Sequence, residues 1–122
     1  MNKELYWIGS TQKDMKEMPE DVKDVFGYAL HLAQCGKVHC DVKVLTGFGG
    51  AGVLEVVDDY DNDTYRAVYT IRFEEAVYVL HVFKKKSKKG IATPKPDMDK
   101  IRKRLKLAEE HAKNLRGKRN EK

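Results

Sequence analysis

The chain has 122 residues, of which 41% are hydrophobic and 35% are charged, values typical of one globular domain rather than of a disordered segment. Its longest apolar run, residues 76–83, is too short to span a membrane, and no apolar signal-peptide core follows the first residues. We therefore expect a cytoplasmic protein with a single domain over residues 1–115 and a frayed basic tail over residues 116–122.

The net charge of +5 hides a strong asymmetry along the chain. Residues 1–83 carry 8 Lys and Arg against 14 Asp and Glu, a net of −6, whereas residues 84–122 carry 16 against 5, a net of +11. An acidic body followed by a basic segment favours a polyanionic partner: nucleic acid first, then an acidic protein, then a membrane surface. A solvated charged helix with a charged tail would give the same asymmetry.

The first third of the chain is predicted to form one strand and two helices. Residues 5–8 have the aromatic and β-branched composition of a strand, and Ser10 can cap a short helix after them. Pro19 fits the first turn of a second helix, because a missing N–H costs nothing there. Apolar residues recur at helical spacing from 22 to 33, and Gly36 is suited to end this helix.

From residue 42 the apolar period changes to that of strands. Strands are predicted at residues 42–45, 53–57, 64–73 and 76–83, with a hairpin between the last two. Asp97 can cap a final helix that has one apolar stripe and Lys and Arg on its other faces. The fold class is thus α+β, with the main elements expected in the order β-α-α-β-β-β-α.

Two segments mimic ligand-binding loops. The run from Gly47 to Gly52 matches G-x-G-x-x-G, but it leads into a strand, whereas the dinucleotide fingerprint needs a helix there. The acidic run 59–63 resembles the start of a calcium loop, yet Thr64 and Thr70 occupy the positions that require Gly and Glu. We interpret these segments as a flexible connection between strands and an acidic hairpin turn.

Cysteine usage indicates reduced thiols. Cys35 and Cys40 are too few for a secreted disulfide scaffold of this size. Together with His39 they could be read as zinc ligands, but the second ligand pair of a structural zinc site is missing. We therefore predict neither a metal nor another cofactor.

Basic residues gather where two predicted strands end. Alternation puts Arg66 and Arg72 on one face of strand 64–73. The neighbouring strand runs into five lysines: Lys84, Lys85, Lys86, Lys88 and Lys89. Such a cluster suits phosphates, because Arg binds them as a bidentate fork and Lys as a point charge. It can cleave RNA by stabilising the charge that develops on phosphorus, or it can only bind the backbone; the residues leave both readings open.

Several motifs resemble one family. They are the strand Tyr-Arg-Ala-Val-Tyr at 65–69 and the segment Phe-Lys-Lys-Lys-Ser-Lys-Lys-Gly at 83–90, with support from 5–10, 45–49, 53–55 and 93–105. The family is the phage-derived, HigB-like branch of the RelE/ParE toxin superfamily of type II toxin–antitoxin systems. The resemblance implies a small twisted, mostly antiparallel sheet with helices on one face and an open basic groove on the other.

The resemblance also implies an activity and partners. Members are mRNA interferases, ribosome-dependent endoribonucleases that inhibit translation; a cognate helix-turn-helix antitoxin silences them, and no cofactor or membrane is involved. By position, Arg66 matches the strand arginine that stabilises the scissile phosphate, and Lys84 and Lys85 match further catalytic basic residues. The remaining RNA-binding candidates are Arg72, Lys86, Lys88 and Lys89.

The chain departs from the better-known ribonucleases at the strand before the Tyr-Arg motif. Those members often carry basic residues there, whereas this chain has Leu-Glu-Val-Val at 54–57. Glu55 or His81 could serve as the proton acceptor instead, although alternation groups His81 with Val77, Val79 and Phe83 and favours a core histidine. The alternatives are a non-catalytic toxin of the same fold, such as a ParE-like gyrase inhibitor, or a phage accessory protein.

Overall fold

The structure, a computed structural model, describes residues 2–49, 52–85 and 93–120. Its elements, in chain order, are β1 (Glu4–Trp7), α1 (Thr11–Lys16), α2 (Glu20–Gln34), β2 (Val42–Val44), β3 (Val53–Tyr60), β4 (Asp63–Thr70), β5 (Ala76–Lys85) and α3 (Lys95–Asn120). The α+β class is confirmed. The short strand predicted at residues 42–45 is present as β2, so four strands follow α2, one more than the predicted order of main elements contained.

The five strands form one sheet in the order β1-β5-β4-β3-β2. Its neighbours are antiparallel except β1 and β5, which run parallel, so the sheet is mostly antiparallel as predicted. The acidic run forms the β3–β4 hairpin, with positive φ at Asp61 (50°) and Asn62 (68°), as a two-residue type I′ turn requires. The glycine-rich loop leads directly into β3, which confirms a connection between strands.

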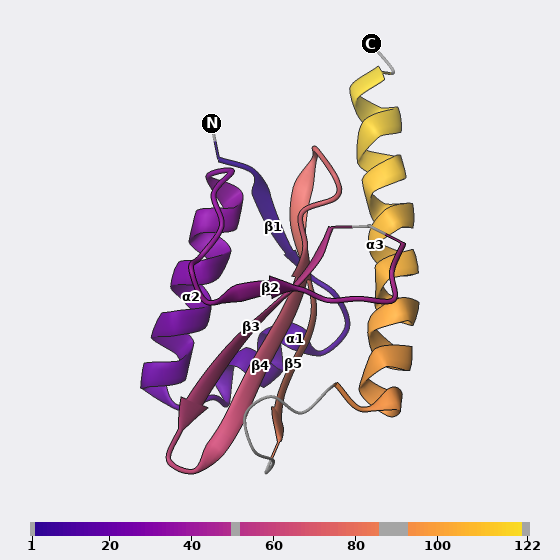
Figure 1. The fold of residues 1–122 in the computed structure, drawn as a ribbon. Coiled ribbons are helices and arrows are strands. Elements are labelled where there is room, and N and C mark those ends of the chain that lie inside the picture. Colours follow the sequence, from indigo (N-terminus) through magenta and orange to yellow (C-terminus); the bar gives the residue numbers. More distant parts are fainter. Residues whose placement is uncertain (1, 50–51, 86–92, 121–122) are drawn as a thin grey trace.

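Helices cover both faces of the sheet, with α2 on one side and α3 on the other (Figure 1). One core lies between the sheet and α2 and includes Val22, Phe26 and Leu30; the other lies between the sheet and α3 and includes Ile101, Ala108 and Ala112. The expectation that the helices share one face is therefore wrong. The physical reason is the apolar stripe of α3, which needs a partner and finds it on the face opposite α2.

The ends of α2 follow from local chemistry. Pro19 occupies the N-cap and the first turn carries Glu20 and Asp21, which suit the positive end of the helix dipole. At the other end Gly36 has φ +80°, and the Gly36 and Lys37 N–H groups donate to the carbonyls of Ala33 and Leu32. This is the Schellman pattern, which confirms Gly36 as the stop signal.

A β-bulge in β5 decides which side chains face α3. Tyr69 pairs with Val79 and Val68 with His81, so Leu80 is an extra residue in the ladder. Val77 and Val79 belong to the α2-side core, whereas Leu80 belongs to the α3-side core and His81 stacks on Phe83 of that same core. His81 is buried as predicted and lies with Phe83, but alternation wrongly grouped it with Val77 and Val79, which face α2.

Three further expectations about element ends differ from the structure. Strand β4 ends at Thr70, so Arg72 lies beyond it. Helix α3 begins at Lys95, with the Met98 N–H donating to the Pro94 carbonyl, so Asp97 lies within its first turn rather than at the N-cap. The helix continues to Asn120, past the residue at which a frayed tail was expected.

Candidate active site

The strand register places the polar side chains of the α3 face in neighbouring rows. In one row Lys43 of β2 pairs with Glu55 of β3, Glu55 with Val68 of β4, and Val68 with His81 of β5. In the next row Arg66 pairs with Phe83, and in the row after that Thr64 pairs with Lys85. Directly opposed side chains in antiparallel strands lie close, and diagonal ones remain within reach of long side chains. The sheet thus assembles a polar cluster from four strands.

Glu55 and Arg66 form the buried half of this cluster. The Arg66 Nη1 atom lies 3.6 Å from Glu55 Oε2, and the Lys43 Nζ atom lies 3.6 Å from Glu55 Oε1. The Thr93 hydroxyl donates to Glu55 Oε2 at 2.9 Å and accepts from Arg66 Nη1 at 3.4 Å. Glu55 and Arg66 are 0% and 1% exposed, so removing one charge leaves the other buried, which typically costs about 3–5 kcal/mol.

His81, Asp97 and Lys85 form the other half. The imidazole Nε2 of His81 lies 2.8 Å from Asp97 Oδ1, and the Lys85 ammonium lies 3.8 Å from Asp97 Oδ2. Burial lowers the pKa of His81 from 6.5, against the opposing effect of its hydrogen bond to Asp97. The neutral imidazole is therefore favoured at pH 7, and in that form Nε2–H donates to the carboxylate.

The two halves meet at Phe83. Its ring stacks on His81 with centroids 4.3 Å apart, and it lies directly across the ladder from Arg66. Two residues outside the sheet complete the cluster: Thr93, just before α3, contacts Glu55 and Arg66, and Asp97, in the first turn of α3, contacts His81. The cluster combines a fixed guanidinium, an ammonium and an imidazole held by a carboxylate, which are the groups that phosphoryl chemistry without a metal requires.

The predicted site residues do not all meet. Arg66 and Lys85 belong to the cluster on the α3 face. Lys84 points to the opposite face and pairs with Asp63 at 3.3 Å. Arg72 is exposed beyond the far end of β4, six residues from Arg66, with its guanidinium 5.8 Å from the Phe73 ring centroid. The prediction that Arg66 and Arg72 share one site is therefore wrong. Lys86, Lys88 and Lys89 lie outside the described residues.

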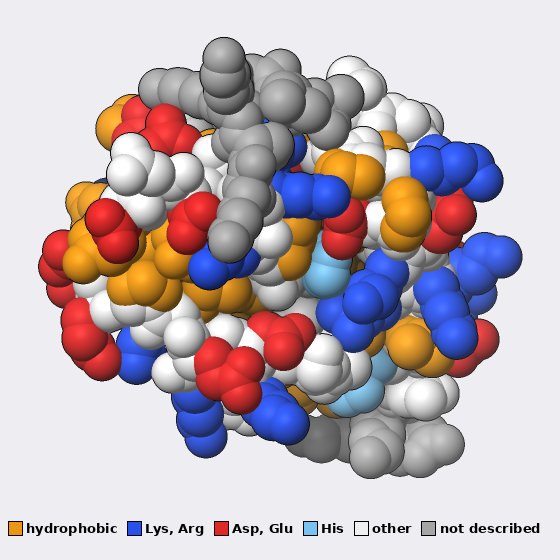
Figure 2. Space-filling model, turned by 90° about the horizontal axis from the view of Figure 1, so that it is seen from below, with side chains coloured by type: hydrophobic (Ala, Val, Ile, Leu, Met, Phe, Trp, Pro, Cys, Tyr) orange, Lys and Arg blue, Asp and Glu red, His pale blue; other side chains and the backbone are white. Residues whose placement is uncertain are grey.

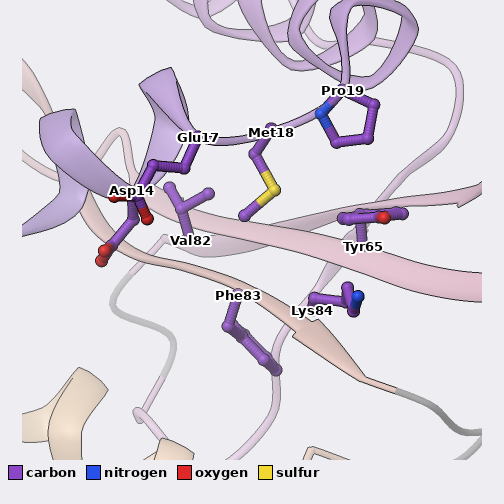
Figure 3. Close-up of a pocket in the computed structure, with 8 residues that line it drawn as sticks. All are labelled: Asp14, Glu17, Met18, Pro19, Tyr65, Val82, Phe83 and Lys84. Carbon is purple, nitrogen blue, oxygen red and sulfur yellow. The ribbon is translucent and has the colours of Figure 1, made fainter.

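Lys84 instead lines a groove of about 390 Å³ between the α1–α2 junction and the ends of β4 and β5 (Figure 3). The groove has an apolar floor that includes Met18, Tyr65 and Val82, and an acidic rim formed by Asp14 and Glu17. The side chain of Phe83 points away from Met18 in this view. The acidic rim makes the groove unsuited to a phosphate backbone.

The cations of α3 gather on one side of the end of the molecule that carries the β3–β4 hairpin, and acidic side chains gather on the other (Figure 2). Arg104 anchors the helix there, because its guanidinium donates to the Leu80 carbonyl at 3.0 Å and to the Ser10 hydroxyl at 3.3 Å. Beside it, Lys100 and Lys103 line an open cavity of about 430 Å³. The charge asymmetry of the sequence is therefore also an asymmetry in space.

The cysteines lie apart from this cluster. Both are free and exposed, and Cys35 contacts His31 with its Sγ 3.8 Å from Nε2. The potential ligand atoms of His39, Cys40 and Asp41 lie within 4.8 Å of one another. The three donors are consecutive on one exposed loop, so the set is local and not assembled by the fold.

A comparison with protein families identifies the chain. The family described as Phage derived protein Gp49-like (DUF891) matches residues 13–106, most of the chain. The chain belongs to this Gp49-like family. No curated protein and no solved structure shows a significant match. Within the described residues, no helix is both long enough and apolar enough to cross a membrane.

Three members of the cluster are not predicted as site residues by the sequence. Lys43 belongs to no motif, Thr93 carries no predicted role although it begins the supporting segment 93–105, and Asp97 is predicted only as a helix cap. Glu55, a candidate proton acceptor from the sequence, is fully buried. One signal in the sequence points to this burial: Glu55 stands in the otherwise apolar segment 53–57 beside an Arg-bearing strand, and a buried carboxylate needs a cation.

Proposed function

We propose that this Gp49-like protein is the toxin of a type II toxin–antitoxin system and acts as a ribosome-dependent mRNA endoribonuclease. The observation that carries the proposal is the position of Arg66, fixed by Glu55 and Thr93 on the α3 face of the sheet, with Lys85 one row away. The match to a phage-derived family supports a toxin-like context. The chemistry would be cleavage by the ribose 2′-OH, which needs no metal.

Each group has a definite part in this chemistry. Arg66 stabilises the extra negative charge on phosphorus in the transition state. Lys85 supplies a second positive charge, and with Lys43 it offsets the carboxylates of Asp97 and Glu55. The basic surface of α3 then binds further backbone phosphates, of mRNA or of ribosomal RNA, by counterion release. A cognate helix-turn-helix antitoxin would be the protein partner.

A second candidate, a non-catalytic toxin of the ParE kind, is favoured by one observation. Arg66 is 1% exposed and engaged by Glu55 and Thr93, an arrangement equally suited to a structural ion pair. For RNA to reach Arg66, the contact with Thr93 must open. On this reading the protein acts through its surface, and no message is cut.

The test is primer-extension mapping of a message on ribosomes after brief induction. Arg66→Ala is a poor variant, because it leaves Glu55 buried without its guanidinium partner. Arg66→Lys keeps the charge but loses the bidentate fork, and we expect cleavage to fall at least 100-fold while thermal unfolding changes little. Arg72→Lys is the matched control at an exposed position and should cleave like wild type.

The outcomes separate the two candidates. Cleavage within codons that depends on Arg66 supports the ribonuclease. Uncut messages together with inhibition of DNA gyrase in a supercoiling assay support the ParE-like alternative. Uncut messages with neither growth arrest nor gyrase inhibition contradict both.

A further inference from the structure

The described part of the cluster offers few groups able to accept a proton. Glu55 is enclosed by Arg66, Lys43 and Thr93, so its negative charge is already committed. Arginine stays protonated in proteins, and Lys85 is paired with Asp97. The Asp97 carboxylate is engaged by His81 and Lys85. The remaining candidate is His81, whose imidazole is held by Asp97 at 2.8 Å.

The geometry of this pair defines which nitrogen is the base. Nε2 faces Asp97, and within the described residues no group hydrogen-bonds Nδ1. A carboxylate that accepts the N–H of one ring nitrogen fixes the tautomer and leaves the lone pair on the other, the same logic by which a buried Asp orients a catalytic His. Phe83 stacks on the ring and prevents it from turning.

We propose that His81 is the general base of the ribonuclease reaction and that Asp97 is its positioning residue; this inference rests on the proposed function. Nδ1 takes the proton of the ribose 2′-OH as that oxygen attacks phosphorus. The P–O5′ bond breaks, and the Lys85 ammonium gives a proton to the departing O5′. The products are a 2′,3′-cyclic phosphate and a 5′-OH end, and water returns the proton from His81 to Lys85.

His81 is shielded from solvent, whereas Asp97 and Lys85 beside it are partly exposed. His81 is 4% exposed, whereas the side chains of Asp97 and Lys85 are 19% and 34% exposed. Nδ1 is turned away from the Asp97 contact, so binding of the RNA must expose that edge of the ring. Catalytic contacts are often incomplete in the free enzyme and form only with the substrate in place.

Charged groups on every neighbouring element affect the imidazole. From α3, Asp97 favours the protonated ring, while Arg104 and Lys100 disfavour it. From the sheet, Lys85 faces Asp97 and Arg66 lies across from the stacked Phe83 ring. The net effect with burial is a lowered pKa for His81, so a base with this environment remains ready to accept a proton at pH 7.

The experiment measures cleavage of ribosome-bound message by the full chain from pH 5 to 8. For His81→Gln we expect a loss of at least 100-fold at pH 7.5, the usual size of a general-base effect. For Asp97→Asn we expect about a 10-fold loss and an acid limb displaced to lower pH, because removing the carboxylate further lowers the pKa of His81. A merely structural role would not move that limb.

Two variants serve as matched controls. Asp99→Asn changes an exposed carboxylate two residues from Asp97. Asp99 pairs with Lys95 and Arg102 at the surface. His111→Gln changes a second imidazole, on α3, that contacts Tyr78 of β5. Both should keep activity within twofold and leave the acid limb in place. For His81→Ala, added imidazole should restore part of the rate.

The outcomes distinguish this inference from the proposed function. If wild type cleaves and His81→Gln retains more than a third of its rate, or if the acid limb of Asp97→Asn stays where it is, His81 is not the base although the ribonuclease stands. If wild type cuts no message, both fail together. Should His81→Gln lose its cooperative thermal transition, the imidazole rescue of a folded His81→Ala decides, and absence of rescue overturns the proposal.

Discussion

The two faces of the sheet are built on different principles. Against α2, the sheet contributes a continuous apolar surface that includes Ala67, Tyr69 and Val77, each 0% exposed. Against α3, the same strands bury Glu55, Arg66 and His81. Among the described residues, the buried charged or imidazole side chains are those three, all on the α3 face. Because the buried charges of the described residues lie on the α3 face, we expect the apolar α2 face to contribute most of the stability.

The difference extends to the helices. The α2 side is filled by large side chains such as Phe26 and Leu30, whereas Ala108 and Ala112 let α3 approach the sheet closely. At its N-terminal end α3 contacts the sheet through polar groups, His81 with Asp97 and Leu80 with Arg104. Apolar packing continues along the helix from Ile101 to Ala112, so these polar contacts at the N-terminal end are added to it.

The largest effect on stability is expected from breaking the buried Glu55–Arg66 pair on the α3 face. Arg66→Ala should lower the free energy of unfolding by about 3–5 kcal/mol, because it leaves the Glu55 carboxylate buried without its guanidinium. Combining Arg66→Met with Glu55→Gln should recover most of the loss in urea unfolding. On the α2 face, Phe26→Ala should cost about 3–5 kcal/mol through a cavity, and no charge change elsewhere should rescue it. If the double variant recovered none of the lost free energy of unfolding, the proposed difference between the α3 face and the α2 face would be contradicted.

The next effect is a pH dependence confined to the α3 face. The folded-state pKa of His81 lies below its unfolded value of 6.5, so the unfolded chain binds the proton more readily. The stability from the neutral imidazole is present above pH 6.5 and is lost as the pH falls from 6.5 toward the folded pKa. Urea unfolding at pH 7.5 and 5 should show a smaller drop for His81→Gln than for wild type. Equal drops would mean that other groups carry the dependence.

A smaller effect concerns the polar contact at the distal half of α3. The Tyr78 hydroxyl lies 2.7 Å from His111 Nδ1, and burial raises the pKa of Tyr78 to about 12. Tyr78→Phe should cost about 0.5–1.5 kcal/mol, the usual net value of one hydrogen bond, as measured by thermal unfolding. It should also remove an ionisation near pH 12 from the ultraviolet titration. Tyr69→Phe, on the α2 face, serves as the comparison.

The smallest effect is expected on the outer surface of α3. Lys113 and Glu109 form an exposed i, i+4 pair with nitrogen and oxygen 3.8 Å apart. Lys113→Ala should change the free energy of unfolding by less than about 0.5 kcal/mol, since such pairs contribute little in water. A loss of more than 1 kcal/mol would mean that this surface takes part in folding.

Much of the fold could be predicted from the residues. The apolar period of α2, the stop at Gly36 and the acidic turn each follow from local chemistry, and the structure confirms them. Arg66 was singled out by its strand position, and Lys85 by the charge that follows β5. The site beyond those two residues was not predictable in the same way, because Glu55, Thr93 and Asp97 become neighbours only through pairing of strands and docking of α3.

The α+β class and most element types can be predicted from the residues alone, because they depend on periodicity and on capping residues within a few positions; the uneven charge is a property of the residue order. The tertiary structure decided which face each residue occupies. One extra residue at Leu80 moves His81 to the α3 face, and docking of α3 on that face brings Asp97 within 2.8 Å of it. Alternation has a period of two, so a single bulge reverses every later assignment, and no local pattern in β5 announces it.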